Sequence, residues 1–401
     1  MRILVVCQYY YPEPFRVNDI CEEMVKRGHE VTVVTGEPNY PEGRIYKGYE
    51  RHQKSDEIIN GVKVHRCPII PRKTGTVYRF LNYFSYPQRA KKYIKSLTAS
   101  DGNPFDIVFV NQLSPVMMAE PAISYKKKHG TPVVMYCLDL WPESLVAGGV
   151  SRGFVIYKVF HRISKRIYRG VDRILITSRL FRGYLKEQFG VEDDKIDYLP
   201  QYAEGLFEKQ PYKENNGVVD LVFAGNIGAV QSVETIVKAA EKLQGQPVHF
   251  HIVGSGTDLE RLQGLAKELR NITFYGRRPL EEMPEFYAKA DAMLVTLQAD
   301  PVLSLTLPGK VQSYMAVGKP IIGAIDGETA EVIRRARCGY CGKADDVEGL
   351  TKNIELFMGS NEKKQMGENA RNFYETYFER HKFMDKLEEE LYRLSSSIKR
   401  G

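Results

Sequence analysis

Apolar and polar positions alternate along the chain between two kinds of segment. Short apolar runs rich in β-branched residues, such as 2–7 and 30–35, are typical of buried parallel strands. Between them, the stretch 17–27 has apolar residues at helical spacing and is followed by Gly28, a residue suited to the left-handed position after a helix. This order of strand, loop, helix, glycine and strand predicts a parallel α/β fold.

The same pattern occurs in two successive series. In the first, strands are predicted at 106–110, 132–137 and 171–177, and helices at 114–128 and 178–189. The second series has predicted strands at 221–224, 248–253 and 272–276, and helices at 232–243, 258–269 and 280–290. The last segment, 345–399, is charged and predicted to be helical. Two parallel α/β domains are expected, with a boundary near residue 200.

One unit of the second series carries a candidate for anion chemistry. Pro308 and Gly309 suit the loop before a helix, and Gly318 suits the residue after one, so a short helix over 310–317 is predicted between strands at 292–297 and 320–324. The N-terminus of such a helix lies at the carboxyl edge of the sheet, where open α/β folds bind ligands. Lys310 in its first turn adds a point charge suited to phosphate. The alternative is an ordinary βαβ unit with a solvated lysine.

Chain length, net charge and the lengths of the apolar runs limit the number of domains, the ligands and the cellular location that are expected. A chain of 401 residues favours two domains, and its net charge of +7 fits phosphate-bearing ligands or an anionic membrane surface without arguing for nucleic acid. No apolar run approaches the roughly 18 residues of a membrane span, and the apolar start is too short for a signal peptide. A cytoplasmic protein is therefore expected.

The six cysteines are expected to be free thiols. Four of them are scattered through predicted strands and helices, as buried thiols would be. Cys338 and Cys341 form a lone Cys-x-x-Cys, and a zinc site would need two further ligands at similar spacing, which the neighbouring sequence does not supply. Metal or redox chemistry is disfavoured there.

Several short motifs occur in a fixed order along the chain. They are the loop Tyr10-Tyr11-Pro12 with Pro14 and Arg16, then Arg27-Gly28-His29-Glu30-Val31, Gly225-Asn226-Ile227-Gly228, Ile252-Val253-Gly254-Ser255-Gly256, and Pro308-Gly309-Lys310 through to Lys319-Pro320. With these motifs the chain resembles, over essentially its whole length, the family 4 glycosyltransferases of the GT-B fold. Within that family it is most similar to the bacterial subgroup resembling L-fucosamine transferases of surface-polysaccharide assembly.

The resemblance implies an architecture. It consists of an acceptor-side Rossmann-like domain at 1–200, a nucleotide-sugar donor domain at 201–375 facing it across a cleft, and a C-terminal helix at 376–401 that crosses back to the first domain. It also implies a retaining sugar transfer without a metal or other cofactor. The absence of an Asp-x-Asp motif from the sequence is consistent with this, because a divalent ion would then not hold the leaving group.

The resemblance also implies site residues. The expected catalytic residues are Asp139, Lys310 and Arg16. Asp139 follows a predicted strand and suits a proton acceptor or a ligand of a donor hydroxyl, the alternative being a helix N-cap or turn, and Glu143 is a weaker second candidate. The expected donor-binding residues are Gly225, Asn226, Gly254, Gly256, Arg277, Pro308, Gly309, Ser313 and Tyr314.

The chain departs from its relatives at positions that usually carry charge. Where many relatives have an arginine and a lysine it has Asn226 and Gln231, and where many have a pair of glutamates it has Leu305 and Ser313. The relatives' two glycines near the phosphates are replaced by Phe15 and Arg16. Lys310 is then the best remaining cation for the diphosphate, with Arg16 a further candidate. Arg277 is expected near the nucleobase or its phosphates, or else, with Arg278, in a solvated loop.

Two basic segments with interleaved aromatic residues lie in the first half. One covers 72–95, including Arg72 and Lys73, and the other covers 153–168. Such segments suit an anionic membrane surface, and the alternative is a pair of core-facing helices with solvated basic faces. We expect peripheral association with the inner face of the cell membrane, and no nucleic-acid partner, since no nucleic-acid-binding motif accompanies the charge.

Together these observations predict a retaining glycosyltransferase. The expected donor is a nucleotide-linked N-acetylated hexosamine or deoxyhexosamine, with UDP the commonest carrier in the family. The expected acceptor is a saccharide on polyprenyl diphosphate, in capsule or O-antigen assembly. The alternatives are a GT-B nucleotide-sugar epimerase and a non-catalytic protein that binds sugar nucleotides. A Rossmann dehydrogenase is disfavoured, because no Gly-x-Gly-x-x-Gly turn follows the first strand.

Overall fold

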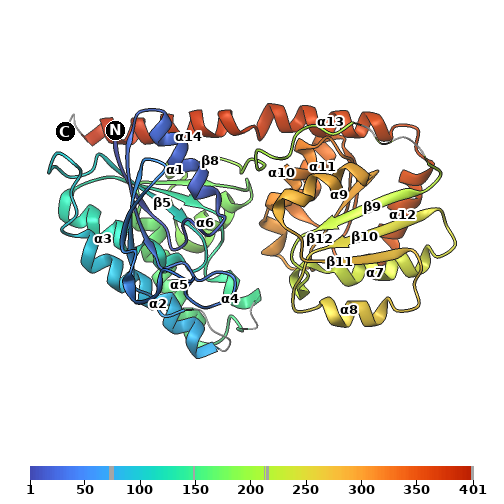
Figure 1. Ribbon diagram of the computed structural model, residues 1–401, viewed down its shortest axis with the longest axis horizontal. Coiled ribbons are helices and arrows are strands. Elements are labelled where there is room, and N and C mark those ends of the chain that lie inside the picture. The colour runs from blue at the N-terminus through green and yellow to red at the C-terminus, as the bar shows by residue number, and fades with distance from the viewer. Residues whose placement is uncertain (72–75, 148–149, 212, 214–215, 399–401) are drawn as a thin grey trace. The chain divides into compact units, whose positions relative to one another are not determined.

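The structure is a computed structural model that describes residues 1–71, 76–147, 150–211, 213 and 216–398. The chain divides into two compact units (Figure 1). Unit 1 comprises Met1–Thr177, Phe181–Leu199 and Met384–Gly401, and unit 2 comprises Ser178–Leu180 and Pro200–Phe383. Each unit is an α/β domain with its own sheet.

Unit 1 is built on an eight-stranded sheet with the order β3-β4-β2-β1-β5-β6-β7-β8. All neighbouring strands are parallel except β3 and β4, which form an antiparallel hairpin at one edge. The strands are β1 (Arg2–Val6), β2 (Glu30–Gly36), β3 (Asp56–Ile59), β4 (Val62–Cys67), β5 (Ile107–Gln112), β6 (Val133–Cys137), β7 (Arg173–Ile176) and β8 (Ile196–Tyr198). The central strands β1, β5 and β6 are almost wholly buried, as their continuous apolar sequence predicts.

The helices of unit 1 connect these strands. They are α1 (Arg16–Lys26), α2 (Thr76–Ile94), α3 (Glu120–His129), α4 (Glu143–Ala147), α5 (Val155–Gly170) and α6 (Phe181–Phe189), with short 3₁₀ turns η1 (Glu50–His52), η2 (Val116–Ala119) and η3 (Asp193–Lys195). The glycines expected after two of these helices, Gly28 and Gly130, have φ of 86° and 73°. A residue with a side chain would be strained in that left-handed conformation, whereas glycine adopts it without steric strain.

Unit 2 is built on a six-stranded, wholly parallel sheet with the order β11-β10-β9-β12-β13-β14. Its strands are β9 (Val219–Ala224), β10 (Val248–Val253), β11 (Ile272–Gly276), β12 (Ala292–Thr296), β13 (Ile321–Ala324) and β14 (Gly339–Gly342). Its helices are α7 (Val233–Lys242), α8 (Leu259–Leu265), α9 (Met283–Lys289), α10 (Gly309–Ala316), α11 (Gly327–Ala336), α12 (Val347–Gly359) and α13 (Lys363–Tyr377), with 3₁₀ turns η4 (Ala229–Gln231), η5 (Leu280–Glu282) and η6 (Leu303–Leu305).

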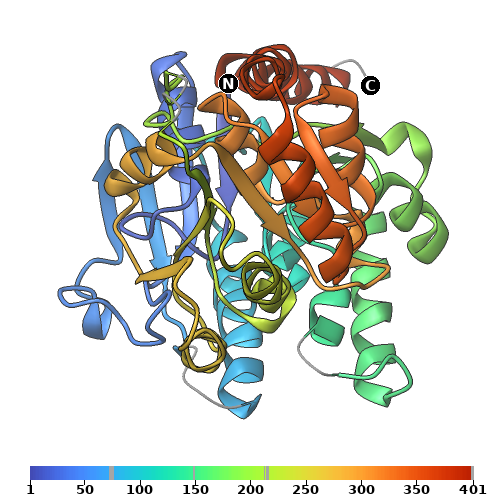
Figure 2. The same ribbon diagram turned by 90° about the vertical axis from the view of Figure 1, so that its right-hand side faces the viewer.

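The sheet of unit 2 has a hydrophobic core on each face, which Figure 2 shows as helices on both sides of the strands. Successive residues of a strand point to opposite faces, so Leu221 and Phe223 of β9 pack with α7, α8 and α12. Val222 and Ala224 of the same strand pack with α9, α10, α11 and α13. Burial on both faces holds β9 and its following loop in a fixed position.

The last helix, α14 (Arg380–Ile398), belongs to unit 1 from Met384 onward. Arg27 donates to Glu388 at 2.7 Å, and Arg173 donates to Glu390 at 2.8 Å. The expected start of this segment at residue 376 falls instead near the end of α13, because the helical and charged pattern does not reveal the short break between α13 and α14.

The predicted fold class is confirmed: the chain has two parallel-sheet α/β domains of the GT-B kind. The hairpin β3–β4 is not predicted by the apolar pattern, because β3 is a half-exposed edge strand with charged residues. The six cysteines are free thiols. None of the helices in the described residues is long and apolar enough to cross a membrane.

Candidate functional site

The short helix α10 follows β12 in the chain, with the 3₁₀ turn η6 between them. Residues adjacent to the helix define where it begins and ends. Pro308 is the N-cap residue, Gly309 the first helical residue, and Gly318, with φ of 73°, follows the helix. The prediction of a helix over 310–317 is confirmed to within one residue. Val311 N of the first turn donates to Pro308 O at 3.0 Å. The N-terminus of a helix carries the positive end of the helix dipole, which favours an anion.

Lys310 lies in this first turn, and its ammonium group is buried. Its Nζ atom lies 3.9 Å from the centre of the Phe223 ring and has no hydrogen-bond partner among the described residues. Burial lowers the pKa of Lys310 to about 7. A buried ammonium without a counter-ion is costly, and an anion at this position would stabilise it.

Gly225 directly follows strand β9 and lies beside the side chain of Lys310. Its φ is 148°, and a Cβ atom there would lie 2.5 Å from Lys310 Nζ. Glycine at this position therefore makes room for the lysine side chain. The structure thus brings together Lys310 and Gly225, which were predicted separately from different motifs.

Gly254 and Gly256 follow β10 and lie against the loop after β9. A Cβ atom on Gly254 would lie 1.8 Å from the carbonyl oxygen of Gly225, and one on Gly256 would lie 2.1 Å from that of Ile227. Two backbone hydrogen bonds join the loops, from Gly225 N to Val253 O at 2.9 Å and from Ile227 N to Ser255 O at 2.8 Å. These two glycines fix the loop that carries Gly225 by allowing close backbone approach.

The neighbouring predicted residues are neutral or exposed. Asn226 is exposed and donates to Oε1 of Gln231 at 2.8 Å, so the two residues pair with each other. Arg277 and Arg278 are exposed, and Arg278 donates to the carbonyl oxygen of Tyr275. Lys310 is accordingly the cation that the structure places against the Gly225 loop.

The side chain of Tyr314 contacts the backbone at the end of β9. Its side chain is fully buried, and its hydroxyl both accepts from Ala224 N and donates to Ala224 O, each at 3.1 Å. Tyr314 therefore ties α10 to the end of β9, and its expected role in donor binding stays a prediction. Ser313, one residue earlier, is nearly buried and donates through Oγ to Oε2 of Glu204 at 3.1 Å.

Asp139 follows β6 in unit 1. Its carboxylate accepts from Ser144 Oγ at 2.6 Å, and burial raises its pKa although hydrogen bonds from Ser144 and Ser114 oppose the rise. A carboxyl group whose pKa is moved toward neutrality suits proton transfer. The structure leaves this prediction open.

Glu143, the second candidate, has a structural role. Its Oε1 atom accepts from the hydroxyls of Tyr157 and Tyr184, each at 2.7 Å, and its Oε2 atom accepts from Arg152 at 2.7 Å. All of these partners are side chains of unit 1. Because both oxygens are engaged with these side chains, Glu143 holds α4, α5 and α6 together, and its role as a second catalytic candidate stays a prediction.

Arg16 is the first residue of α1, and its guanidinium lies near enough to Tyr136 to affect the pKa of that hydroxyl.

Two acidic residues with a possible chemical role, Glu13 and Glu204, are not indicated by the sequence pattern. Glu13 is buried, and burial raises its pKa to about 7; its Oε1 atom accepts from Tyr40 N at 2.7 Å, while Oε2 has no partner in the described part of the chain. Glu204 is the second of these residues, and it accepts a hydrogen bond from Ser313 of α10.

Two family models match the chain and together cover most of it. The one described as a glycosyl transferase 4-like domain matches residues 15–201, and the one described as glycosyl transferases group 1 matches residues 206–373. The chain belongs to the family 4 glycosyltransferases of the GT-B fold. It is therefore a transferase enzyme.

Relatives and solved structures agree with this assignment. WcaI of Escherichia coli strain K12, named as a colanic acid biosynthesis glycosyl transferase, is 25% identical over 342 residues, covering 79% of this chain and 82% of WcaI. MJ1069 of Methanocaldococcus jannaschii, named as a glycosyltransferase, is 25% identical over 409 residues, covering 94% of this chain and 95% of that protein. HepE of Anabaena, solved in complex with UDP and glucose, shares the fold with a TM-score of 0.71 at 14% identity, over 98% of this chain and 99% of that chain.

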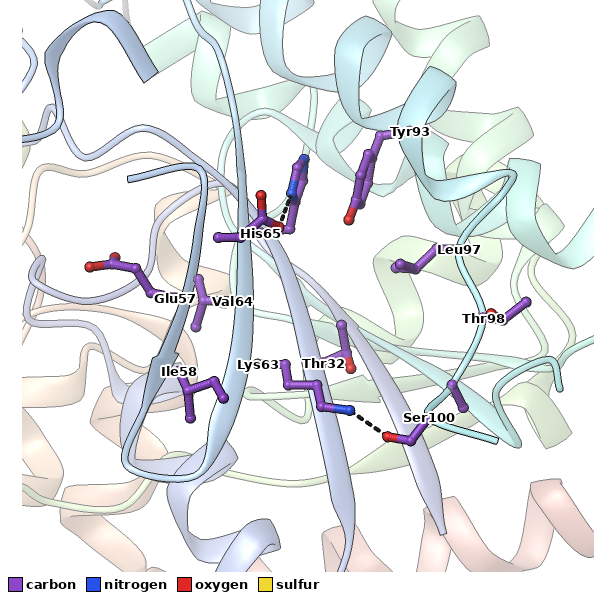
Figure 3. Close-up of a pocket in the computed structure, with 12 residues that line it drawn as sticks. Thr32, Glu57, Ile58, Lys63, Val64, His65, Tyr93, Leu97, Thr98 and Ser100 are labelled. Carbon is purple, nitrogen blue, oxygen red and sulfur yellow. Dashed lines mark hydrogen bonds and ion pairs between the residues drawn. The ribbon is translucent and has the colours of Figure 1, made fainter. Parts of the chain in front are cut away.

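Open α/β folds bind ligands at the carboxyl edge of their sheets, and the cavity shown in Figure 3 lies elsewhere. It has a volume of about 460 Å³ and lies in unit 1 between the β3–β4 hairpin, β2 and the end of α2. Its charged groups pair with one another or with adjacent residues. His65 pairs with Asp56 at 2.7 Å and stacks on Tyr93, while Lys63 pairs with Glu30 at 3.1 Å. We assign no ligand to it.

The two basic segments form helices α2 and α5 of this glycosyltransferase, which pack together through aromatic rings. Phe80 and Phe84 of α2 stack on Phe160 of α5, with ring centres 5.8 and 6.0 Å apart. Apolar side chains are nevertheless exposed on both helices, including Leu81, Val155 and Val159. Exposed basic residues accompany them: Arg89, Lys92, Lys95, Lys158, Arg162 and Lys165. Arg72 and Lys73 lie outside the described residues.

Proposed function

We propose that the protein is a retaining glycosyltransferase of surface-polysaccharide assembly. It transfers an N-acetylated hexosamine or deoxyhexosamine from a UDP-linked donor to a saccharide carried on polyprenyl diphosphate, without a metal ion. The name of WcaI, which refers to colanic acid biosynthesis, and the UDP in the HepE structure support this choice of pathway and donor. Capsule and O-antigen assembly are the two settings that fit such an acceptor.

The observation that carries the proposal is the buried, unpartnered ammonium of Lys310 at the N-terminus of α10. A departing nucleoside diphosphate develops negative charge that fixed donors must stabilise. The backbone N–H groups of the first turn of α10, with Gly225 leaving room for the lysine, supply donors of that kind. The transferred sugar keeps its configuration when attack occurs on the face that the diphosphate leaves.

In this scheme Asp139 of unit 1 acts on the acceptor, and Arg16 of the same unit acts on the donor. Asp139 is the proposed group that takes up or holds the acceptor hydroxyl proton, and its raised pKa fits that role. Arg16 is a proposed further cation for the diphosphate. No group of three or more His, Cys, Asp or Glu side chains is placed to hold a metal ion among the described residues.

Calorimetric titration tests the donor site. UDP, GDP and ADP are titrated, with EDTA present, into the wild type and into Lys310→Met, which keeps an unbranched side chain of similar length without its charge. We expect one nucleotide to bind the wild type and to bind the variant at least about tenfold more weakly, because a charge-assisted contact is lost.

Lys364→Met serves as the control, because Lys364 is an exposed lysine of α13 in the same unit. Unchanged binding by Lys310→Met would remove the donor site from α10. If none of the nucleotides binds the wild type, the proposed donor site on α10 is overturned. Turnover of a nucleotide sugar without acceptor would favour the epimerase.

A further inference from the structure

Two loops of unit 1 carry three aromatic side chains that pack on one another. Tyr9 and Phe15 belong to the loop after β1, and Tyr40 belongs to the loop after β2. The rings of Tyr9 and Phe15 stack with centroids 5.2 Å apart and an angle of 17° between their planes. The Tyr40 ring is tilted against both, with its centroid 5.8 Å from Tyr9 and 5.5 Å from Phe15. We call these three rings the aromatic platform.

The exposure of the three rings differs in a regular way. Tyr9 is 5% exposed, Phe15 is half-buried and Tyr40 is 43% exposed. A single exposed aromatic residue is common on protein surfaces and needs no explanation. Tyr40 differs from that case, because its ring packs on two others and so keeps a defined orientation.

A buried carboxylate fixes the backbone that carries Tyr40. Glu13 is fully buried, and its Oε1 atom accepts from Asn39 N at 2.9 Å and from Tyr40 N at 2.7 Å. Burying a carboxylate is costly unless hydrogen bonds compensate for the lost hydration. These two hydrogen bonds join the loop after β1 to the loop after β2, so Glu13 is a positioning residue for the aromatic platform.

The aromatic platform lies at the edge of the sheet where open α/β folds bind ligands. Both of its loops follow the carboxyl ends of their strands, and β1 pairs with β2 on one side and with β5 on the other. The chain crosses from one side of β1 to the other between β4 and β5, so the loop after β1 borders a topological switch point. Such a point is the usual place for a ligand in this kind of sheet.

From this geometry we infer that the aromatic platform binds one pyranose ring of the acceptor, with Tyr40 stacked on the C–H face of that ring. The inference rests on the proposed function, in which the acceptor is a saccharide. The negative face of an aromatic ring attracts the C–H groups that gather on one face of a pyranose. Arg44 donates to Glu42 at 2.9 Å on the same loop, and both side chains are exposed. These polar groups suit sugar hydroxyls and are unfavourable neighbours for a polyprenyl chain.

Saturation-transfer NMR tests the inference with small sugars and without a nucleotide. The methyl β-glycosides of glucose, galactose and N-acetylglucosamine are titrated into the wild type, with sorbitol as a polyol that has hydroxyls but no ring. We expect at least one glycoside to bind, with the strongest saturation on the axial C–H protons of one ring face. Tyr40→Ala should weaken this binding by about 2- to 10-fold, whereas Tyr40→Phe keeps the ring and should bind as the wild type does.

Two further comparisons separate a ligand contact from a structural effect. Tyr377→Ala removes a similarly exposed tyrosine from α13 of unit 2 and should leave glycoside binding unchanged. Glu13→Ala releases the backbone of Tyr40 and should weaken glycoside binding as Tyr40→Ala does. Glu13→Gln keeps an oxygen acceptor for the two N–H groups and should restore the binding. The Tyr40 variants remain interpretable if Glu13→Ala does not fold, because Tyr40 is a surface residue.

The outcomes separate the inference from the proposed function. Failure of every glycoside to bind the wild type, equal saturation of sorbitol, or unchanged binding by Tyr40→Ala overturns the role of the aromatic platform, and the nucleotide titrations still decide the donor site. An effect of Tyr40→Phe as large as that of Tyr40→Ala also overturns it, because the ring would then not be the contact. Glycoside binding that depends on the Tyr40 ring, in a protein that binds no nucleotide, supports the platform and overturns the proposed donor site on α10.

Discussion

At the scale of the single residue, Lys310 combines a cost to stability with a capacity for binding. Its side chain is placed over Phe223 without a counter-ion, and burial lowers its pKa to about 7. A phosphate group next to this lysine would offset the free-energy cost of burying its ammonium. Under the proposed function, the same residue destabilises the free protein and stabilises the complex, a combination that is common at functional sites.

The stability cost can be measured with Lys310→Met. The folded-state pKa is about 7 and the unfolded value 10.5, so between these values the unfolded chain binds more protons and the wild type gains stability as pH rises. We expect the variant to be more stable than the wild type by on the order of 4 kcal/mol at pH 7. Urea unfolding at pH 7.0 and 8.5 should show this difference shrinking, with a slope that approaches about 1.4 kcal/mol per pH unit as the folded-state lysine loses its proton. Equal stabilities at pH 7 would mean that the ammonium is hydrated in the folded protein.

The affinity for a nucleoside diphosphate should also depend on pH through Lys310. A bound diphosphate favours the ammonium and raises its pKa above about 7, so binding above pH 7 takes up a proton. The affinity of the wild type for UDP is therefore expected to fall from pH 7.5 to 9, by up to about tenfold per pH unit. Titrations in buffers of different ionisation enthalpy would count the protons. Lys310→Met should bind weakly and without this pH dependence, and a wild type with constant affinity over the same range would contradict the prediction.

At the scale of the element, the donor site depends on how the loops after β9 and β10 meet. The loop after β9 carries Gly225, and the loop after β10 carries Gly254, whose missing side chain lets the two backbones touch. The loop after β10 packs against the loop after β9 and so fixes the position of Gly225. The two glycines therefore have separable roles, one toward the lysine and one toward the backbone.

Alanine substitutions should separate these roles. In Gly225→Ala the new Cβ meets the flexible end of Lys310, so we expect a loss of about 1–2 kcal/mol in stability and a clear loss of UDP affinity. In Gly254→Ala it meets the carbonyl oxygen of Gly225 at 1.8 Å, so a loss of about 3 kcal/mol or more is expected. Gly264→Ala, in α8 with open space around it, is the control and should gain up to about 1 kcal/mol. Urea unfolding and calorimetry measure both effects, and similar losses from all three substitutions would refute the distinction.

Elements that carry a local signal could be predicted from the sequence. The buried strands appear as apolar runs, and α10 is marked by Pro308, Gly309 and Gly318, because turn and cap residues act within a few positions. Sequence spacing did not reveal that the hydroxyl of Tyr314 pairs with the backbone of Ala224, because the two residues lie far apart in the chain. Glu204 was missed because its partner is 109 residues away, and no local period reports such a contact.

At the scale of the whole molecule, charge and exposed apolar surface occur together on unit 1. The net charge of the chain is +7, and the exposed bases of α2 and α5 accompany apolar side chains that the packing of the two helices leaves uncovered. An acceptor on polyprenyl diphosphate would be met at an anionic membrane surface. Basic and apolar residues on the same helices are the combination that such a surface attracts.

Vesicle sedimentation would test this association at the level of the intact protein. We expect binding to vesicles that contain phosphatidylglycerol, little binding to neutral vesicles, and release at high salt, because screening weakens the attraction. Each exposed base contributes about 1 kcal/mol near such a surface, so Lys92→Gln with Lys158→Gln should weaken binding by roughly thirtyfold. Val155→Ser with Val159→Ser should also weaken it, since these side chains are 77% and 45% exposed and contribute little to the fold.

The matched controls for the vesicle experiment lie on unit 2. Lys352→Gln with Lys364→Gln removes the same charge from α12 and α13, and Leu356→Ser removes an exposed apolar side chain of α12. All of these variants keep the overall fold intact, because the altered side chains are on the surface. If the unit 2 controls weaken binding as much as the unit 1 variants do, attraction by net charge alone explains it. Selective loss in the unit 1 variants would instead locate the membrane contact on α2 and α5, within the domain proposed to take the lipid-linked acceptor.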